Sequence, residues 1–179
     1  DGLYWGYTGE EKLRRRIAFA RASAELITTF GLSPLFVLTN DAYTGIFNGI
    51  VRSDHIYYAN PNFKRTSFFH IIHNGGWQYF DSYHRHENGK DLFSLFNLPH
   101  WRYNDFSDTT EYDKINCMAS GIRFSDRVIT VSPSYAKQIE KACDGLEKIL
   151  HNVIGISNAL GIDFKNRITR QFHHSDRKS

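Results

Sequence analysis

The sequence predicts an α/β fold with a parallel sheet covered by helices. Four short runs of β-forming residues alternate with amphipathic helical patterns, an order typical of parallel sheets. The four runs end in polar residues: Asn40-Asp41, His73-Asn74, Ser132 and Ser157-Asn158. Because right-handed crossovers give all strands one direction, we expect these polar groups to line one cleft.

The first third of the chain predicts a helix, a strand and a second helix. Thr8 and Glu11 have the spacing of a capping box, and apolar residues then recur every three or four positions until Gly31, which is well placed to end the helix. Residues 35–38 predict a short buried strand. A helical pattern with apolar residues on one face follows, from Asp41 to about Ile50.

The run from Ser67 to Ile72 predicts the second strand. It is apolar over most of its length, as expected of a strand buried on both faces of a parallel sheet. His73 and Asn74 follow at its carboxyl end, where an open α/β sheet places ligand chemistry. The next two residues are glycines, which allow a sharp turn and leave room for a ligand. A core strand followed by a polar turn is the alternative interpretation.

The second half begins with a long loop region and then becomes regular. Between Asn74 and about Tyr112 only one short amphipathic piece, residues 91–96, is predicted; a loop this long in a compact domain is usually functional. A helix containing Ile115, Met118, Ala119 and Ile122 follows, then a strand at 127–131. Ser132 and Pro133 predict the start of the next helix, and residues 153–156 the last strand.

Composition limits the function classes. The formal charge of +3, from 22 Lys and Arg against 19 Asp and Glu, is too small to indicate nucleic acid, and no apolar run approaches the roughly 20 residues that span a bilayer. We therefore expect neither a nucleic-acid nor a membrane partner. The two cysteines, Cys117 and Cys143, fall in helical patterns and are expected to be reduced core thiols in an intracellular protein, cytoplasmic or in a plastid. The chain lacks an initiator Met, so we expect a piece of a longer protein.

Neither a metal nor a cofactor is indicated. The nine His residues match no zinc spacing, and His70 and His73 are three apart on a strand, so they face opposite sides. No phosphate-binding loop or dinucleotide fingerprint is present. Asp41 and His73 could form an acid–base pair, although spacing alone does not bring them together. Aromatic residues make up 15% and lie in polar company, which suits sugar rings, buried loops and interfaces alike.

An ordered set of motifs resembles the N-terminal domain of glycogen and starch synthases, retaining glucosyltransferases with the two-domain GT-B fold. The strongest segment, residues 112–139 with Ser132-Pro133-Ser134-Tyr135, is similar to the family's N-x-x-K-x-G-I-x-x-A-D-x-V-T-T-V-S-P-T-Y-A-x-E-I. Residues 72–78 resemble I-H-N-x-x-Y-Q-G, and residues 155–163 resemble G-I-x-N-G-I-D. The likeness covers about residues 1–164 in collinear order.

The resemblance implies a fold, a reaction and a site. The fold would be a Rossmann-like parallel sheet with helices on both faces, half of a GT-B fold, formed by residues 1–164 and followed by a polar, poorly ordered tail at 165–179. The reaction would be hexosyl transfer from ADP-glucose or UDP-glucose to an α-1,4-glucan with retention. The donor would bind mostly through a C-terminal domain that is missing here. His73 matches the family histidine beside the transferred glucose, and the expected substrate-binding residues are Asp41, Asn74, Trp77, Tyr79 and Asn158.

Departures from the family pattern leave alternatives open. The family's H-D-W reads Asn40-Asp41-Ala42 here, and the K-x-G-G loop and the C-terminal domain are absent, so this chain alone is expected to be inactive. A non-catalytic glucan-binding or scaffolding module of the same fold is the first alternative. A related GT-B transferase with another donor or acceptor is the second.

Overall fold

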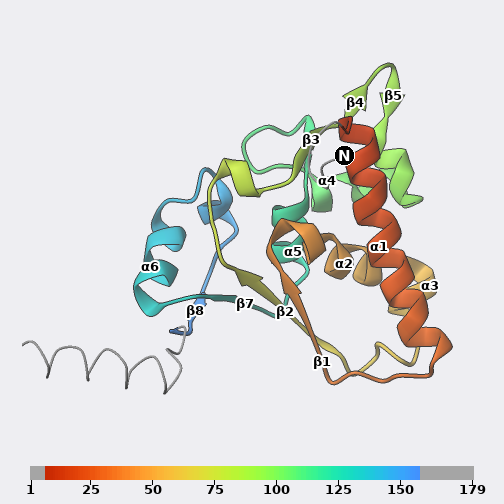
Figure 1. Ribbon diagram of the computed structural model, residues 1–179, viewed down its shortest axis with the longest axis horizontal. Coiled ribbons are helices and arrows are strands. Elements are labelled where there is room, and N and C mark those ends of the chain that lie inside the picture. Colours follow the sequence, from red (N-terminus) through yellow and green to blue (C-terminus); the bar gives the residue numbers. More distant parts are fainter. Residues whose placement is uncertain (1–6, 158–179) are drawn as a thin grey trace, which may run out of the picture.

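The computed structural model describes residues 7–157, which form a four-stranded parallel sheet flanked by helices (Figure 1). The sheet order is β1-β2-β7-β8, and every neighbouring pair is parallel. The α/β class and the shared strand direction are therefore confirmed. The strands are β1 (Phe36–Asn40), β2 (Ser67–Ile72), β7 (Arg127–Thr130) and β8 (Ile154–Gly155).

Local capping signals set the helix boundaries. Both halves of the predicted capping box form, since the Thr8 hydroxyl accepts from the Glu11 N–H at 3.2 Å and Glu11 Oε2 accepts from the Thr8 N–H at 2.9 Å. Ser132 caps the helix that Pro133 begins, as predicted. The larger helices are α1 (Gly9–Thr29), α2 (Asp41–Ser53), α5 (Cys117–Arg123) and α6 (Pro133–Lys141), with the shorter α3 (His55–Tyr58) and η4 (Leu146–Lys148).

The segment between β2 and α5 contains only short elements, as the sequence predicted. Two small antiparallel pairs, β3 with β6 and β4 with β5, hold it together. One expectation here was wrong: Ile115 lies in β6, opposite Tyr83, and α5 starts only at Cys117. The elements are η1 (Trp77–Tyr79), β3 (Ser82–His84), β4 (His86–Glu87), β5 (Lys90–Asp91), η2 (Leu92–Phe96), η3 (His100–Arg102), α4 (Tyr103–Phe106) and β6 (Lys114–Asn116).

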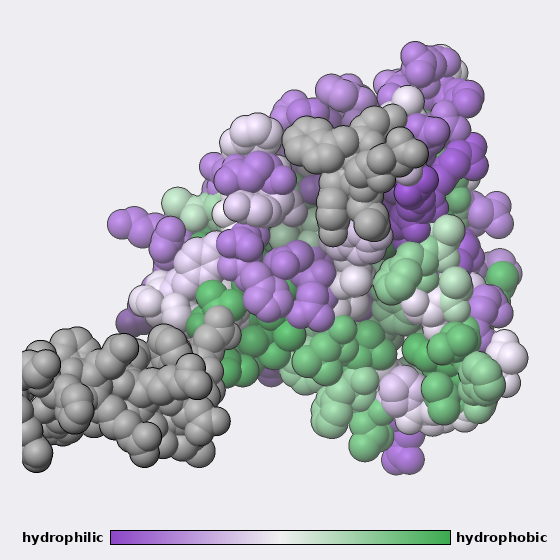
Figure 2. Space-filling view, in the orientation of Figure 1, coloured by the Kyte–Doolittle hydropathy of each residue, from purple (hydrophilic) through white to green (hydrophobic). Residues whose placement is uncertain are grey.

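Within residues 7–157 one face of the sheet is buried and the other is partly exposed, so the helices on both faces that the resemblance implied are not seen in this part of the chain. The strand order β1-β2-β7-β8 follows the order of the chain, and right-handed crossovers in that order place α2, α5 and α6 on the same side. The strand at 35–38 is therefore not buried as expected, since Phe36 is 61% exposed and Leu38 56% exposed. Along β2, buried residues alternate with half-buried ones, so only one face is fully buried. Figure 2 shows apolar residues, coloured green, gathered on the lower part of the surface in this view.

The tightest packing in the core joins α2, α5 and β2. His70 is fully buried, with Nδ1 2.9 Å from the Thr39 hydroxyl and Nε2 3.2 Å from Met118 Sδ. Gly45 of α2 and Gly121 of α5 both lie against its imidazole ring. The two helices can approach this closely because neither glycine has a side chain at the contact.

Burial of His70 makes a pH dependence of stability testable. Burial lowers the pKa of His70 from 6.5 to about 4, because the charged imidazolium loses its hydration. The unfolded chain binds this proton below pH 6.5 but the folded chain does not, so stability falls as the pH drops from about 6.5 to about 4. The expected loss is about 3 kcal/mol. It is measured as the unfolding free energy of the β2 amides by hydrogen exchange at a series of pH values.

The control for this prediction is a histidine outside the core. His84→Ala removes an exposed imidazole and should leave the pH dependence unchanged, whereas His70→Leu should flatten it in this window. Carboxylates with lowered pKa, such as Asp91 and Asp108, lose their contribution only at lower pH. An equal slope in the wild-type protein and His70→Leu would contradict the assignment.

Candidate active site

Asp41 and His73 meet at the carboxyl ends of β1 and β2. The backbone N–H of His73 donates to Asp41 Oδ1 at 2.8 Å, and His73 Nδ1 lies 3.2 Å from Asp41 Oδ2. Both side chains are accessible, since that of His73 is 44% exposed and that of Asp41 is 35% exposed. The contact that spacing alone did not reveal is therefore formed, at the edge of the sheet where the strand pattern placed the cleft.

The parallel register explains how residues 32 positions apart come together. Asn40 is the last residue of β1 and pairs with Ile71 of β2, so Asp41 follows β1 at the level of Ile72, the residue before His73. Asp41 then adopts a φ of +48°, a conformation that is costly for a residue with a side chain. Thr44 holds this turn, since its hydroxyl accepts from the Asn40 N–H at 2.6 Å and donates to the Asn40 carbonyl at 2.8 Å.

The pair leaves one ring nitrogen of His73 without a contact to Asp41. The carboxylate of Asp41 accepts a hydrogen bond from the backbone N–H of His73 and also contacts Nδ1 of its ring. When the proton is on Nδ1 and donates to this carboxylate, Nε2 carries the lone pair and can accept a hydrogen bond from a hydroxyl group. The contact fixes the orientation of the imidazole.

Two residues from α6 and the segment after it hold the glycine turn that follows the pair. The Gly75 N–H donates to the Tyr135 hydroxyl at 2.6 Å, and the Trp77 N–H donates to Asp144 Oδ2 at 2.9 Å. Gly76 has a φ of +132°, which disfavours any other residue. Sequence reasoning named Tyr135 only as part of a motif and missed the contact of its hydroxyl with Gly75. The Ser-Pro-Ser-Tyr segment was the available signal.

The other predicted substrate-binding residues are placed less tightly. Asn74 is exposed beside His73, while Trp77 and Tyr79 lie in η1 and are 74% and 45% exposed. Trp77 lines a small cavity of about 150 Å³ together with Asp108 and Asp144. Asn158 lies outside the described residues. Within the described part of the chain, Asp41 and His73 are the predicted residues that the structure joins by hydrogen bonds.

The described residues show no features of a metal site or a membrane span. Among residues 7–157, no group of three or more His, Cys, Asp or Glu is arranged to hold a metal ion. No helix in this range is long and apolar enough to cross a membrane. Cys117 and Cys143 are free and buried, as expected, and burial raises the pKa of Cys143 to about 11.

Solved structures contain a close match to this fold. The catalytic domain of starch synthase IV from Arabidopsis thaliana, bound to ADP and acarbose, superimposes with a TM-score of 0.64 at 26% identity. The match covers 90% of this chain and 32% of the plant chain. The fold of this chain therefore matches about a third of the plant chain.

Sequence comparisons give the same family. Glycogen synthase of Clostridioides difficile is 30% identical over 168 residues, which is 90% of this chain and 33% of the relative. Glycogen synthase of Thermotoga maritima is 29% identical over 173 residues, at 93% and 33% coverage. The chain thus spans about a third of the length of these relatives. The family model described as starch synthase catalytic domain matches residues 1–152. The resemblance in the motifs is confirmed, and the chain belongs to the starch synthase catalytic domain family.

Proposed function

We propose that the complete protein containing this chain is a glucosyltransferase of the glycogen and starch synthase type. It moves glucose from ADP-glucose or UDP-glucose to the non-reducing end of an α-1,4-glucan with retention of the anomeric configuration. The observation that carries the proposal is the contact between Asp41 and His73 at the carboxyl ends of two neighbouring strands. Membership of the starch synthase catalytic domain family supports it.

His73 is proposed as the catalytic residue that contacts the transferred sugar near its reacting carbon. The transition state of such transfers resembles an oxocarbenium ion, so the protein positions the sugar and stabilises charge rather than supplying a strong base. Asp41 fixes the imidazole. Asn74, Trp77, Tyr79 and Asn158 are proposed to bind substrate, and residues 1–164 to form the acceptor side of the cleft.

The partners and setting follow from the same reasoning. The plant structure bound to ADP and acarbose supports a nucleotide-sugar donor and a glucan acceptor. In this proposal most of the donor site lies in the part of the protein outside this sequence, and this chain alone is inactive. The free, buried thiols of Cys117 and Cys143 support an intracellular location.

Product analysis with the complete protein tests this function. The protein is incubated with maltooligosaccharides and, separately, ADP-glucose, UDP-glucose and nucleotide sugars of other hexoses. We expect longer α-1,4-linked products with one of the two glucose donors, and NMR of the first product should show an α linkage. Binding of the oligosaccharide without elongation would instead favour the non-catalytic module. Transfer of another sugar would favour a related transferase.

A further inference from the structure

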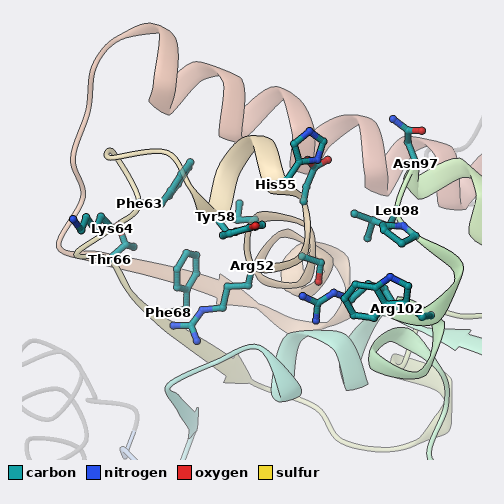
Figure 3. Close-up of a pocket in the computed structure, with 15 residues that line it drawn as sticks. Arg52, His55, Tyr58, Phe63, Lys64, Thr66, Phe68, Asn97, Leu98 and Arg102 are labelled. Carbon is teal, nitrogen blue, oxygen red and sulfur yellow. The ribbon is translucent and has the colours of Figure 1, made fainter.

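A groove of about 600 Å³ (Figure 3) lies beside the first residues of β2, whereas His73 follows the last residue of that strand. Its walls come from the end of α2, from α3, from the residues just before and in β2, and from residues 97–102. Its volume is in the range of small-molecule sites. β2 runs from the groove at Ser67 to Ile72 next to His73, so the two sites are about 20 Å apart.

The lining of the groove carries excess positive charge. Arg52, Lys64 and Arg102 line it, against one carboxylate, that of Asp54. Asp54 is only 3% exposed, and Arg21 already binds its Oδ2 at 2.8 Å. Because this negative charge is matched from outside the groove, the cations remain to attract an anionic ligand.

The two arginines keep donors available for such a ligand. Arg52 contacts Asp126 at 2.6 Å, and Arg102 contacts Asp105 at 3.1 Å. Neither aspartate lines the groove. A guanidinium has five N–H donors, so one contact to a carboxylate leaves others for a second acceptor. Figure 3 shows that Arg52 and Arg102 reach the groove from different segments of the chain.

Two buried donors of the lining lack a hydrogen-bond partner among the described residues. One is the Ser53 hydroxyl, in a residue that is 6% exposed, and the other is Nε of Arg102. Buried polar atoms without a partner are rare, because each costs its hydration without a replacement. Both atoms belong to residues that line the groove but are themselves buried, so oxygens of a bound anion would satisfy them once these side chains turn toward it.

Aromatic side chains add a second kind of contact. Trp101 and Tyr58 line the groove and are 69% and 59% exposed. The guanidinium carbon of Arg102 lies 4.3 Å from the centre of the Trp101 ring, so the charged group and the aromatic surface are adjacent. A ligand with a phosphate next to a ring would contact both.

We propose that this groove binds a small phosphomonoester that carries a sugar ring. The phosphate is held by Arg102, Arg52 and the Ser53 hydroxyl, and the ring lies against Trp101 and Tyr58. Hexose monophosphates and nucleoside monophosphates share this chemistry. The groove is remote from the Asp41–His73 pair, so the proposal is independent of the proposed transfer reaction.

Calorimetric titration of the complete protein tests the site. The probes are inorganic phosphate, glucose 6-phosphate, adenosine monophosphate and glucose. We expect at least one of the two ring-bearing phosphates to bind about tenfold or more tightly than inorganic phosphate, and glucose not to bind at this groove. Ser53→Ala should weaken this binding by about tenfold, and Arg102→Gln by more. The probe that binds most tightly shows whether the groove prefers a hexose monophosphate or a nucleoside monophosphate.

The variants separate ligand binding from folding. Ser53→Ala removes a hydroxyl without a partner, so the unfolding midpoint should not fall while the affinity does. Arg14→Gln is the matched control for Arg102→Gln, because Arg14 makes a comparable surface pair with Glu10 on α1 and should leave the affinity unchanged. Equal affinity in the wild-type protein, Ser53→Ala and Arg102→Gln would overturn the proposal. Equal affinity for inorganic phosphate and both ring-bearing ligands would overturn the proposal that the groove recognises a ring.

Discussion

Replacing His73 with alanine in the complete protein is expected to lower turnover by much more than tenfold, on the order of a hundredfold, while the fold stays intact. The imidazole is held in place by the contact of its Nδ1 with Asp41, while the backbone N–H of His73 binds the same carboxylate, so loss of the ring removes a preorganised group from the proposed sugar site. Loss of a group that acts mainly in the transition state lowers kcat more than it raises KM. The measurement is steady-state glucosyl transfer to maltooligosaccharides, with circular dichroism and the unfolding midpoint recorded on the same samples.

The control for this variant is another exposed histidine. His84 lies on β3, is 66% exposed and comes no closer than 3.8 Å to a carboxylate, that of Asp113. His84→Ala should therefore keep both turnover and stability. Normal turnover of His73→Ala would remove His73 from the active site, and the Asp41 contact would then be a structural feature of the strand ends.

Local signals in the sequence were enough to predict most of the elements. The Thr8–Glu11 capping box and the Ser132-Pro133 start both form as predicted, because each depends on residues within one turn of the chain. The run from Ser67 to Ile72 matches β2 residue for residue. The carboxyl-end rule then placed His73 correctly, because it follows from strand direction alone.

Features that depend on distant residues could not be predicted. Phe36 and Leu38 read as core residues, yet their exposure depends on which face of the sheet the helices cover. Ile115 fits a helical pattern, but pairing with Tyr83 draws it into a strand. The Tyr135 hydroxyl reaches Gly75 across 60 positions of sequence, and periodicity carries no information on such a contact.

The site shows the same division. Asp41 and His73 were each predicted from the ends of their strands, but their hydrogen bonds depend on the register between β1 and β2. The groove around Arg102 had no sequence signal, since its lining comes from three separate segments. Nearness in the fold, rather than residue type, makes these side chains a site.

Gly121→Ala is expected to destabilise the domain by about 2–4 kcal/mol. A Cβ at this position would lie 2.6 Å from Cε1 of His70 and 2.9 Å from the Cα of Gly45. The second neighbour is backbone, so α2 and α5 would have to move apart. This cost exceeds the gain of about 1 kcal/mol that alanine brings over glycine inside a helix. Hydrogen exchange of residues 41–53 and 117–123, with the unfolding midpoint, measures the effect.

Gly9→Ala provides the matched comparison, because the atom nearest to its added Cβ is the movable carboxylate of Glu87 at 2.9 Å. Its effect should stay within about 0.5 kcal/mol. A second test combines Gly121→Ala with His70→Ala. Removal of the ring relieves part of the clash, so the double variant should be more stable than the sum of the single losses predicts. Unchanged exchange in α2 and α5 of Gly121→Ala would show that these helices separate at little cost. The close contact of Gly45 with Gly121 would then not be what sets the distance between α2 and α5.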